Sequence, residues 1–252
     1  MKLLNVVLSF CVLFVVSGAV ADEPYNPKTI LVVAYEPFDG RKANGSETAA
    51  MYLKGKKFEV LPRDTGVVYT VKVLVLPVVW QEPERLATRY IRDHKPSLVL
   101  GMGECGTYTE MRFETRAVNL RSGQDENGEC PITNYISKGG PYFKHTRLKF
   151  NKDLFDCKFT KSRFAGNYLC NNLFYVTLGA TKAPVGFVHL PSQRDASDED
   201  YLKLVQKNLI LLLEDNLEAK LYTPKPRADQ GDIVPPPPEE DDIPMIFFDI
   251  PE

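Results

Sequence analysis

The sequence predicts a single α/β domain in which a twisted, largely parallel, mixed sheet lies between two layers of helices. Short continuous apolar runs at residues 29–34 and 185–188 are typical of strands that are buried on both faces. Apolar residues recur with helical spacing at 82–94 and 197–216, so strand-like and helix-like segments alternate along the chain. About 200 residues remain once both ends are set aside, which is enough for one substantial core.

The expected elements alternate as a βα architecture requires. Strands are expected at 29–34, at 67–79, in the run that ends before Gly101, around Glu114 and at 185–188. Helices are expected at 46–54, at 82–94, around Cys170 and at 197–216. Ser46 is the expected N-terminal cap of the first helix, and the region from Glu114 to about residue 161 is expected to be irregular.

The two ends of the chain differ in composition from this domain. Lys2 precedes an apolar run at 3–16 and small residues up to Ala21, the pattern of a cleaved secretory signal. We expect cleavage after Ala21 and a secreted or lumenal protein; an uncleaved anchor is the less favoured alternative because the run is short for a membrane span. Proline and acidic residues are abundant near the C-terminus, which predicts a disordered tail. The expected boundaries are 1–21 for the signal, 22–28 for a lead segment, 29–221 for the domain and 222–252 for the tail.

Charge and short motifs exclude several classes of function. A net charge of −2 and a pI near 6.0 provide no basic surface of the density that nucleic-acid binding requires. The run from Gly101 to Gly106 matches the dinucleotide fingerprint Gly-x-Gly-x-x-Gly. However, the residues after it alternate like a strand and do not start the helix that faces a pyrophosphate. Cysteine and histidine spacings match no zinc site. We therefore expect no cofactor and no metal.

Three polar residues are candidates for nucleophilic catalysis. Cys170 is expected in the first turns of a helix, where the dipole favours a thiolate. His189 follows a short apolar strand, at the rim where open α/β sheets place their active sites. Glu114 is a carboxylate that can orient an imidazole. Each also has an ordinary explanation: a buried cysteine that acts as a small hydrophobe, a structural histidine and a charge on an exposed or edge strand.

Four separated segments resemble the pyroglutamyl peptidase I family of cysteine peptidases. They occur in the family's order and span most of residues 29–215. The segments are Ile30 to Gly40 with Asn44 and Ser46, then Phe113-Glu114 with Ala117 and Asn119, then Ala165-Gly166 with Cys170-Asn171, and finally Gly186 to Pro191 with His189.

The resemblance implies an activity and roles for individual residues. Family members remove an N-terminal pyroglutamate, a five-membered lactam, from peptides by acyl transfer to a thiol, without metal or cofactor. Carried over, Cys170 is the nucleophile, His189 the general base and then acid, and Glu114 the residue that orients the histidine. Tyr35, Phe38 and Tyr168 occupy the positions of pocket aromatics, although core packing explains such residues equally well. Pyroglutamyl peptides are the expected partners, and the sequence does not indicate an oligomeric state.

The chain departs from the family pattern at several positions. Gln124 stands where members usually carry an arginine assigned to the oxyanion region, with Arg121 close by. A glutamine donates hydrogen bonds but has no fixed charge. Tyr35 replaces a phenylalanine, Asp39 a glycine and Gly45 a proline. The alternative function is therefore a secreted binding protein that keeps the fold and turns over substrate poorly or not at all.

Secretion gives two further expectations. The mature chain keeps Cys105, Cys130, Cys157 and Cys170. If Cys170 stays free, at most one disulfide forms among the others, and Cys130 with Cys157 is our hypothesis. Asn44-Gly45-Ser46 is a glycosylation sequon. Because the resemblance places it beside the pocket, we expect Asn44 to be unmodified or only partly modified.

Overall fold

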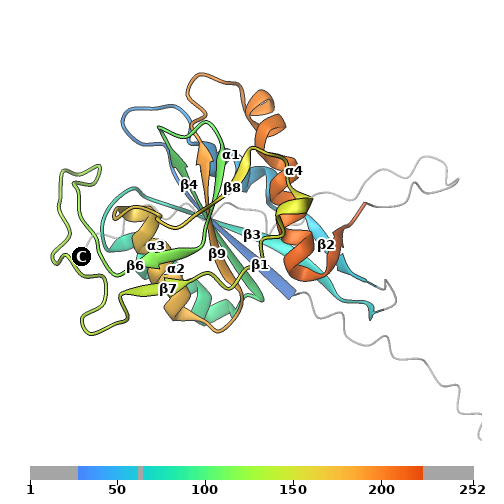
Figure 1. Ribbon diagram of the computed structural model, residues 1–252, viewed down its shortest axis with the longest axis horizontal. Coiled ribbons are helices and arrows are strands. Elements are labelled where there is room, and N and C mark those ends of the chain that lie inside the picture. The colour runs from blue at the N-terminus through green and yellow to red at the C-terminus, as the bar shows by residue number, and fades with distance from the viewer. Residues whose placement is uncertain (1–27, 62–64, 224–252) are drawn as a thin grey trace, which may run out of the picture. The chain divides into compact units, whose positions relative to one another are not determined.

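The computed structural model describes residues 28–61 and 65–223 (Figure 1). The described residues up to Tyr222 belong to one compact unit. The expected signal segment at 1–21 lies outside the described residues, as do the expected lead segment except Lys28 and the expected tail from residue 224 onward. Among the helices of the described part, none is long and apolar enough to cross a membrane.

Within the described residues the main sheet has eight strands in the order β10-β2-β3-β1-β4-β9-β5-β8. They are β1 (Lys28–Tyr35), β2 (Lys57–Val60), β3 (Val68–Leu76), β4 (Leu98–Cys105), β5 (Met111–Glu114), β8 (Phe159–Ser162), β9 (Val185–Pro191) and β10 (Ala219–Leu221). The central strands β3, β1, β4 and β9 are parallel, β5 is antiparallel to β9, and β2 and β10 add antiparallel pairs at one edge. The mixed, largely parallel sheet of the sequence prediction is confirmed.

Two pairs of helices cover the two faces of this sheet. Helices α1 (Gly45–Leu53) and α4 (Asp198–Leu217) pack on one face, and α2 (Glu82–His94) and α3 (Leu169–Ala180) pack on the other (Figure 1). Strand β1 shows why both layers form: Ile30 and Val32 face the first pair, while Leu31 and Val33 face the second, all four fully buried. Burial of such side chains contributes about 1.5–3 kcal/mol each.

Helix α1 begins one residue earlier than the sequence indicated, and its cap is Asn44 instead of Ser46. The Asn44 Oδ1 accepts hydrogen bonds from the Ser46 backbone N–H at 2.9 Å and from the Ser46 hydroxyl at 2.8 Å. Ser46 Oγ in turn accepts the Tyr35 backbone N–H at 3.2 Å, so it joins α1 to β1. The Asn44 Nδ2 donates to the Glu36 carbonyl at 2.8 Å, and the residue is buried. A glycan is attached to this nitrogen, and a residue this buried leaves it no space unless the start of α1 moves.

The glycine-rich run is part of strand β4, whereas this strand was expected to end before Gly101. β4 continues through Gly101 and Gly103 to Cys105, and the next regular element is strand β5. A Cβ at position 103 would lie 2.6 Å from the Cys170 Sγ, so only glycine fits there. Because no helix starts at these glycines, the structure agrees with the dismissal of a dinucleotide site.

Glu114 lies on an interior strand, which corrects the expectation of an exposed or edge position. β5 runs between β9 and β8, and the Glu114 side chain is fully buried. The edge is formed by β8, which comes from the region expected to be irregular. That region also contributes a separate two-stranded sheet, β6 (Arg116–Val118) with β7 (Phe143–His145), and a short 3-10 helix, η2 (Lys152–Leu154).

The hypothesis of a Cys130–Cys157 disulfide is wrong. All four cysteines of the described residues are free, and these two are exposed.

Candidate active site

Three neighbouring strands and one helix end bring the candidate residues together. In the antiparallel pair of β5 with β9, Arg112 lies opposite His189 and Glu114 lies opposite Phe187. Side chains two residues apart on a strand share a face, so Glu114 and His189 are diagonal neighbours on the face covered by α3. β4 lies on the other side of β9, and its Gly103 lies beside Cys170 at the start of α3.

His189 contacts both other members of the expected triad. Its Nδ1 lies 2.8 Å from the Glu114 Oε1, and both side chains are buried. The imidazole is also close enough to the Cys170 sulfur for the charge of that group to act on it. Since Nδ1 is bonded to the carboxylate, Nε2 is the ring nitrogen left for the sulfur. The second carboxylate oxygen, Glu114 Oε2, is buried without a hydrogen-bond partner in the described structure.

The histidine is held in its charged form by this arrangement. Burial by itself lowers the pKa of His189, but the negative charge and hydrogen bond of Cys170, with a further contribution from Glu114, raise it to about 10. At neutral pH the imidazole is therefore protonated. In this state it can donate a proton to a departing group.

The start of α3 places the sulfur among unpaired backbone N–H groups. Cys170 is the second residue of the helix, Tyr168 at the N-cap makes no side-chain cap bond, and no acidic residue lies in the first turn. This terminus favours negative charge on sulfur or on a nearby oxyanion. Asn171 fixes the helix start to β6, because its side chain accepts the Val118 N–H and donates to the Val118 carbonyl, both at 2.8 Å.

The three expected pocket aromatics lie in the apolar cluster that also contains Cys170. Tyr35 is buried and its hydroxyl donates to the Leu169 carbonyl at 2.9 Å. Burial, followed by the charge of Cys170, raises the pKa of Tyr35 well above its usual value. Phe38 is partly buried at the edge of the cluster. The Tyr168 hydroxyl donates to the Gln124 carbonyl at 2.7 Å, and burial is the main cause that raises its pKa to about 12.

Trp80 supports this cluster and was missed by the sequence reasoning. Its ring lies edge-on to Tyr168 with centroids 5.4 Å apart, and its Nε1 donates to the Gly123 carbonyl at 3.0 Å. The sequence drew little attention to Trp80: it is the chain's single tryptophan, but it stands outside the four segments that resemble the family. Glu104, Arg41 and Ser192 were also missed; on the opposite face of β4 the buried Glu104 side chain is bonded to the half-buried Arg41 and Ser192.

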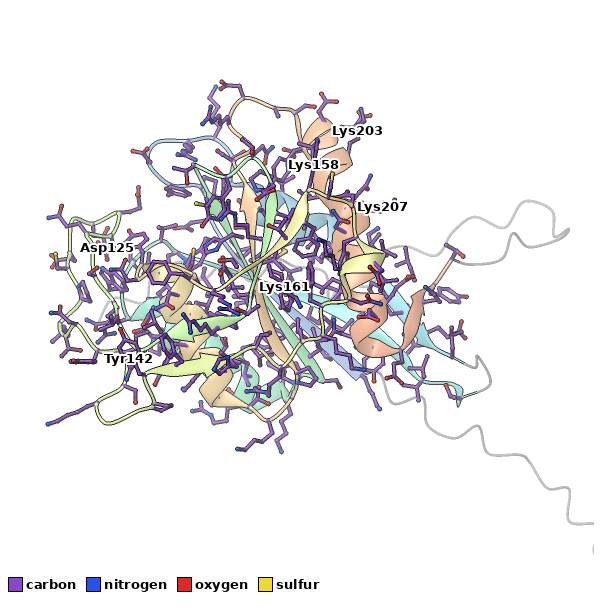
Figure 2. All side chains as sticks on the ribbon, in the orientation of Figure 1. Asp125, Tyr142, Lys158, Lys161, Lys203 and Lys207 are labelled. Atoms are coloured by element: carbon purple, nitrogen blue, oxygen red, sulfur yellow. The ribbon has the colours of Figure 1, made fainter. Side chains whose placement is uncertain are left out.

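The loop that carries Gln124 supplies no cation to the site. Gln124 is exposed, and Arg121 forms an ion pair with Glu84 at 3.2 Å and donates to the Thr133 carbonyl at 2.9 Å. Among the described residues, neither side chain forms a hydrogen bond or ion pair with Cys170. The loop is held by Asp125, labelled in Figure 2, whose carboxylate accepts the Trp80 backbone N–H at 2.8 Å.

The described part of the chain contains no group of three or more His, Cys, Asp or Glu side chains placed to hold a metal ion. What the arrangement provides is a cysteine sulfur, a protonated imidazole and a buried carboxylate close together, beside an aromatic cluster. Such a set performs acyl transfer.

Comparison with known proteins gives a consistent result. A sequence model of the pyroglutamyl peptidase family matches residues 28–201. The pyrrolidone-carboxylate peptidase of Halalkalibacterium halodurans is 26% identical over 206 residues, which cover 74% of this chain and 98% of that protein. The corresponding peptidase of Coprothermobacter proteolyticus is 32% identical over 174 residues, 64% of this chain and 80% of that protein.

The fold comparison agrees with the sequence comparison. The solved structure of the pyrrolidone carboxyl peptidase from Thermococcus litoralis superposes with a TM-score of 0.62 at 26% identity, covering 74% of this chain and 94% of that one. The matched region includes all six expected site residues: four lie on β1, β5, α3 and β9, Phe38 lies in the loop after β1, and Tyr168 is the N-cap of α3. The chain belongs to the pyroglutamyl peptidase family.

Proposed function

We propose that the protein is a cysteine exopeptidase that removes an N-terminal pyroglutamyl residue from peptides. The observation that carries this proposal is the contact of His189 with Glu114 on one side and Cys170 on the other, at a helix N-terminus beside three aromatic rings. Family membership supports an exopeptidase of the cysteine type.

The first half of the reaction forms a thioester. The Cys170 Sγ attacks the carbonyl carbon of the pyroglutamyl residue, and the negative charge that develops on oxygen is stabilised by backbone N–H groups of the first turn of α3. The His189 Nε2 gives its proton to the departing amine as the C–N bond breaks. Glu114 holds the ring and balances its positive charge while it is protonated.

The second half of the reaction releases the acid. His189, now neutral, takes a proton from water while the water oxygen attacks the thioester carbonyl. The C–S bond then breaks, which returns Cys170 to the thiolate and leaves His189 as the imidazolium. Free pyroglutamate leaves, and no co-reactant other than water is consumed.

The aromatic cluster fits an uncharged lactam. A pyroglutamyl ring has no free amine, so a selective pocket needs flat apolar walls and no carboxylate. Tyr35 presents only its ring, since its hydroxyl is already bonded to the Leu169 carbonyl. Tyr168 has likewise committed its hydroxyl to Gln124. With Phe38, these rings form the proposed walls of the pocket.

The place of action is part of the proposal and rests on residues 1–21 alone. The mature protein then begins at Asp22 in the secretory pathway or outside the cell. N-terminal sequencing of the protein recovered from culture medium tests this; a mature chain that retains residues 1–21 contradicts it.

A second candidate function is a binding protein on the same fold that does not turn over substrate. The observation in its favour is that Arg121, the arginine close to Gln124 in the sequence, is bonded to Glu84 and Thr133. Its pocket would bind pyroglutamate without cleaving peptides.

One experiment separates the two candidates. The mature protein is assayed under reducing conditions with a fluorogenic pyroglutamyl amide, beside Cys170→Ser and against the matching prolyl amide. Turnover by the wild type alone, and of the pyroglutamyl amide alone, is the expected result. Binding of pyroglutamate without turnover, from folded protein whose thiol titrates as free, would favour the binding protein.

A further inference from the structure

A second buried glutamate, Glu104, directly follows Gly103, the residue of β4 that lies against Cys170. Because neighbouring residues of a strand face opposite ways, its side chain lies on the other face of the sheet. Its side chain is fully buried and accepts three hydrogen bonds. The Oε1 accepts from Arg41 Nη1 and from the Ser192 hydroxyl, and the Oε2 accepts from the Gly45 backbone N–H, each at 2.6 Å. A buried carboxylate is tolerable only with such partners.

Two of the three partners belong to the loop that carries Phe38. Arg41 and Gly45 both lie between the end of β1 and the first turn of α1. The Arg41 guanidinium carbon lies 4.7 Å from the centre of the Phe38 ring, and the Arg41 N–H donates to the Phe38 carbonyl at 3.1 Å. Asp39 and Gly40 between them have φ values of +56° and +66°, which turn the loop back on itself.

The departures from the family pattern fit this cluster. The family's proline at position 45 has no N–H to offer Glu104, whereas Gly45 does. Gly45 is also required by space, because a Cβ there would lie 2.2 Å from the Tyr201 hydroxyl, which itself donates to the Pro191 carbonyl at 2.9 Å. The loop is thus built around Glu104 in this chain.

The cluster is connected to both reacting groups through the sheet. Glu104 follows Gly103, which lies against the Cys170 sulfur, and Ser192 follows β9, which carries His189. The strands that fix the sulfur and the imidazole therefore also fix the partner of Arg41.

We propose that Arg41, held by Glu104 and Ser192, is a positioning residue that sets the Phe38 ring as a wall of the lactam pocket. This inference rests on the proposed peptidase function and goes beyond it, because it assigns part of the substrate selectivity to a charged pair outside the triad. Arg41 acts on substrate binding through Phe38 and takes no part in bond making.

The test is a double-mutant cycle on Arg41 and Phe38 with the pyroglutamyl amide. We expect Arg41→Met to raise KM about fivefold, the size of one lost cation–π contact, with kcat nearly unchanged. Arg41→Lys, which keeps the charge, restores part of the loss. In a Phe38→Leu background, Arg41→Met has no further effect on KM, because the ring on which it acts is gone.

Matched measurements keep the outcomes distinct. Arg85→Met removes a surface arginine that is paired with Glu82 and should leave KM unchanged. An unchanged KM in Arg41→Met, or an effect of equal size with and without Phe38, overturns the inference while the peptidase function stands. Absence of turnover in the wild type overturns the proposed function instead. If Arg41→Met does not fold, the cycle is run with Arg41→Lys, and an effect that persists in Phe38→Leu again overturns the inference.

Discussion

Glu104 and Glu114 are both buried carboxylates near strand ends, and they differ in how their charge is satisfied. Glu104 has donors on both oxygens, one of them a permanent guanidinium cation. Glu114 has one partner, His189, and its second oxygen has none among the described residues. The charge of Glu104 is therefore balanced at all times, whereas that of Glu114 is balanced only when the imidazole carries its proton. A carboxylate whose two oxygens both accept hydrogen bonds stabilises the fold, whereas one with a single titratable partner responds to the proton on that partner.

The largest test of this contrast is to neutralise each glutamate in turn. Glu114→Gln should lower kcat by about 10²- to 10⁴-fold, because the imidazolium loses its counter-charge and its correct tautomer. Glu104→Gln should act mainly on KM. Steady-state kinetics on folded protein check this, and comparable losses of kcat in both variants would remove the distinction.

The next test follows the protonation of His189 by NMR. Its pKa of about 10 depends first on Cys170 among the groups that raise it, so Cys170→Ser should move the titration midpoint clearly downward. Glu104→Gln should leave the midpoint in place.

The raised pKa of His189 also has a consequence for the stability of the fold. The folded-state pKa lies above the ordinary value of about 6.5, so the charged imidazole stabilises the fold fully below that pH. The contribution is lost as the pH rises through about 10. The stability difference between wild type and His189→Asn should therefore shrink between about pH 6.5 and 10; a difference that grows over this range would contradict the assignment.

Truncation of Glu104 should be costly in stability. Glu104→Ala leaves the buried Gly45 N–H and the Ser192 hydroxyl without an acceptor, and we expect a loss of about 2–3 kcal/mol in the free energy of unfolding. Urea unfolding measures it. Glu82→Ala, which breaks an exposed pair with Arg85, is the control and should cost less than about 1 kcal/mol.

The smallest expected effect concerns Tyr35. Tyr35→Phe removes the hydrogen bond to the Leu169 carbonyl and should cost about 1 kcal/mol of stability while kcat changes little. Tyr90→Phe is the matched control, because within the described residues the Tyr90 hydroxyl forms no hydrogen bond. A large fall in kcat for Tyr35→Phe would instead place its hydroxyl in the reaction.

Local patterns were enough to predict much of the fold. The helix at 82–94 has the predicted bounds, and the helix around Cys170 lies where it was predicted. The strand predicted at 185–188 starts as expected but continues through His189 to Pro191. These elements can be recognised from a short stretch of sequence, because each has either a periodic apolar face or a continuous apolar run. The positions of Cys170 and His189 followed directly.

The remaining features depend on residues that are far apart in the sequence. Glu114 looked like an exposed strand charge because β8, which covers its strand, comes from a region without a clear pattern. Asn44 and Ser46 are both good caps, and only the bond from Tyr35 to Ser46 decides between them. Glu104 gains partners from positions 41, 45 and 192, and no local rule joins these.

The missing side chain at Gly103 determines from which direction the sulfur can react. Backbone of β4 lies on one side of the Cys170 sulfur and α3 on another, and the aromatic rings belong to the same cluster, so a substrate between the rings reaches the sulfur from their side. A carbonyl held by those rings is then attacked on one of its two faces. Inversion of the α-carbon turns the carbonyl away from that approach, so the same geometry that admits an L-pyroglutamyl peptide should leave its D-enantiomer bound but uncut.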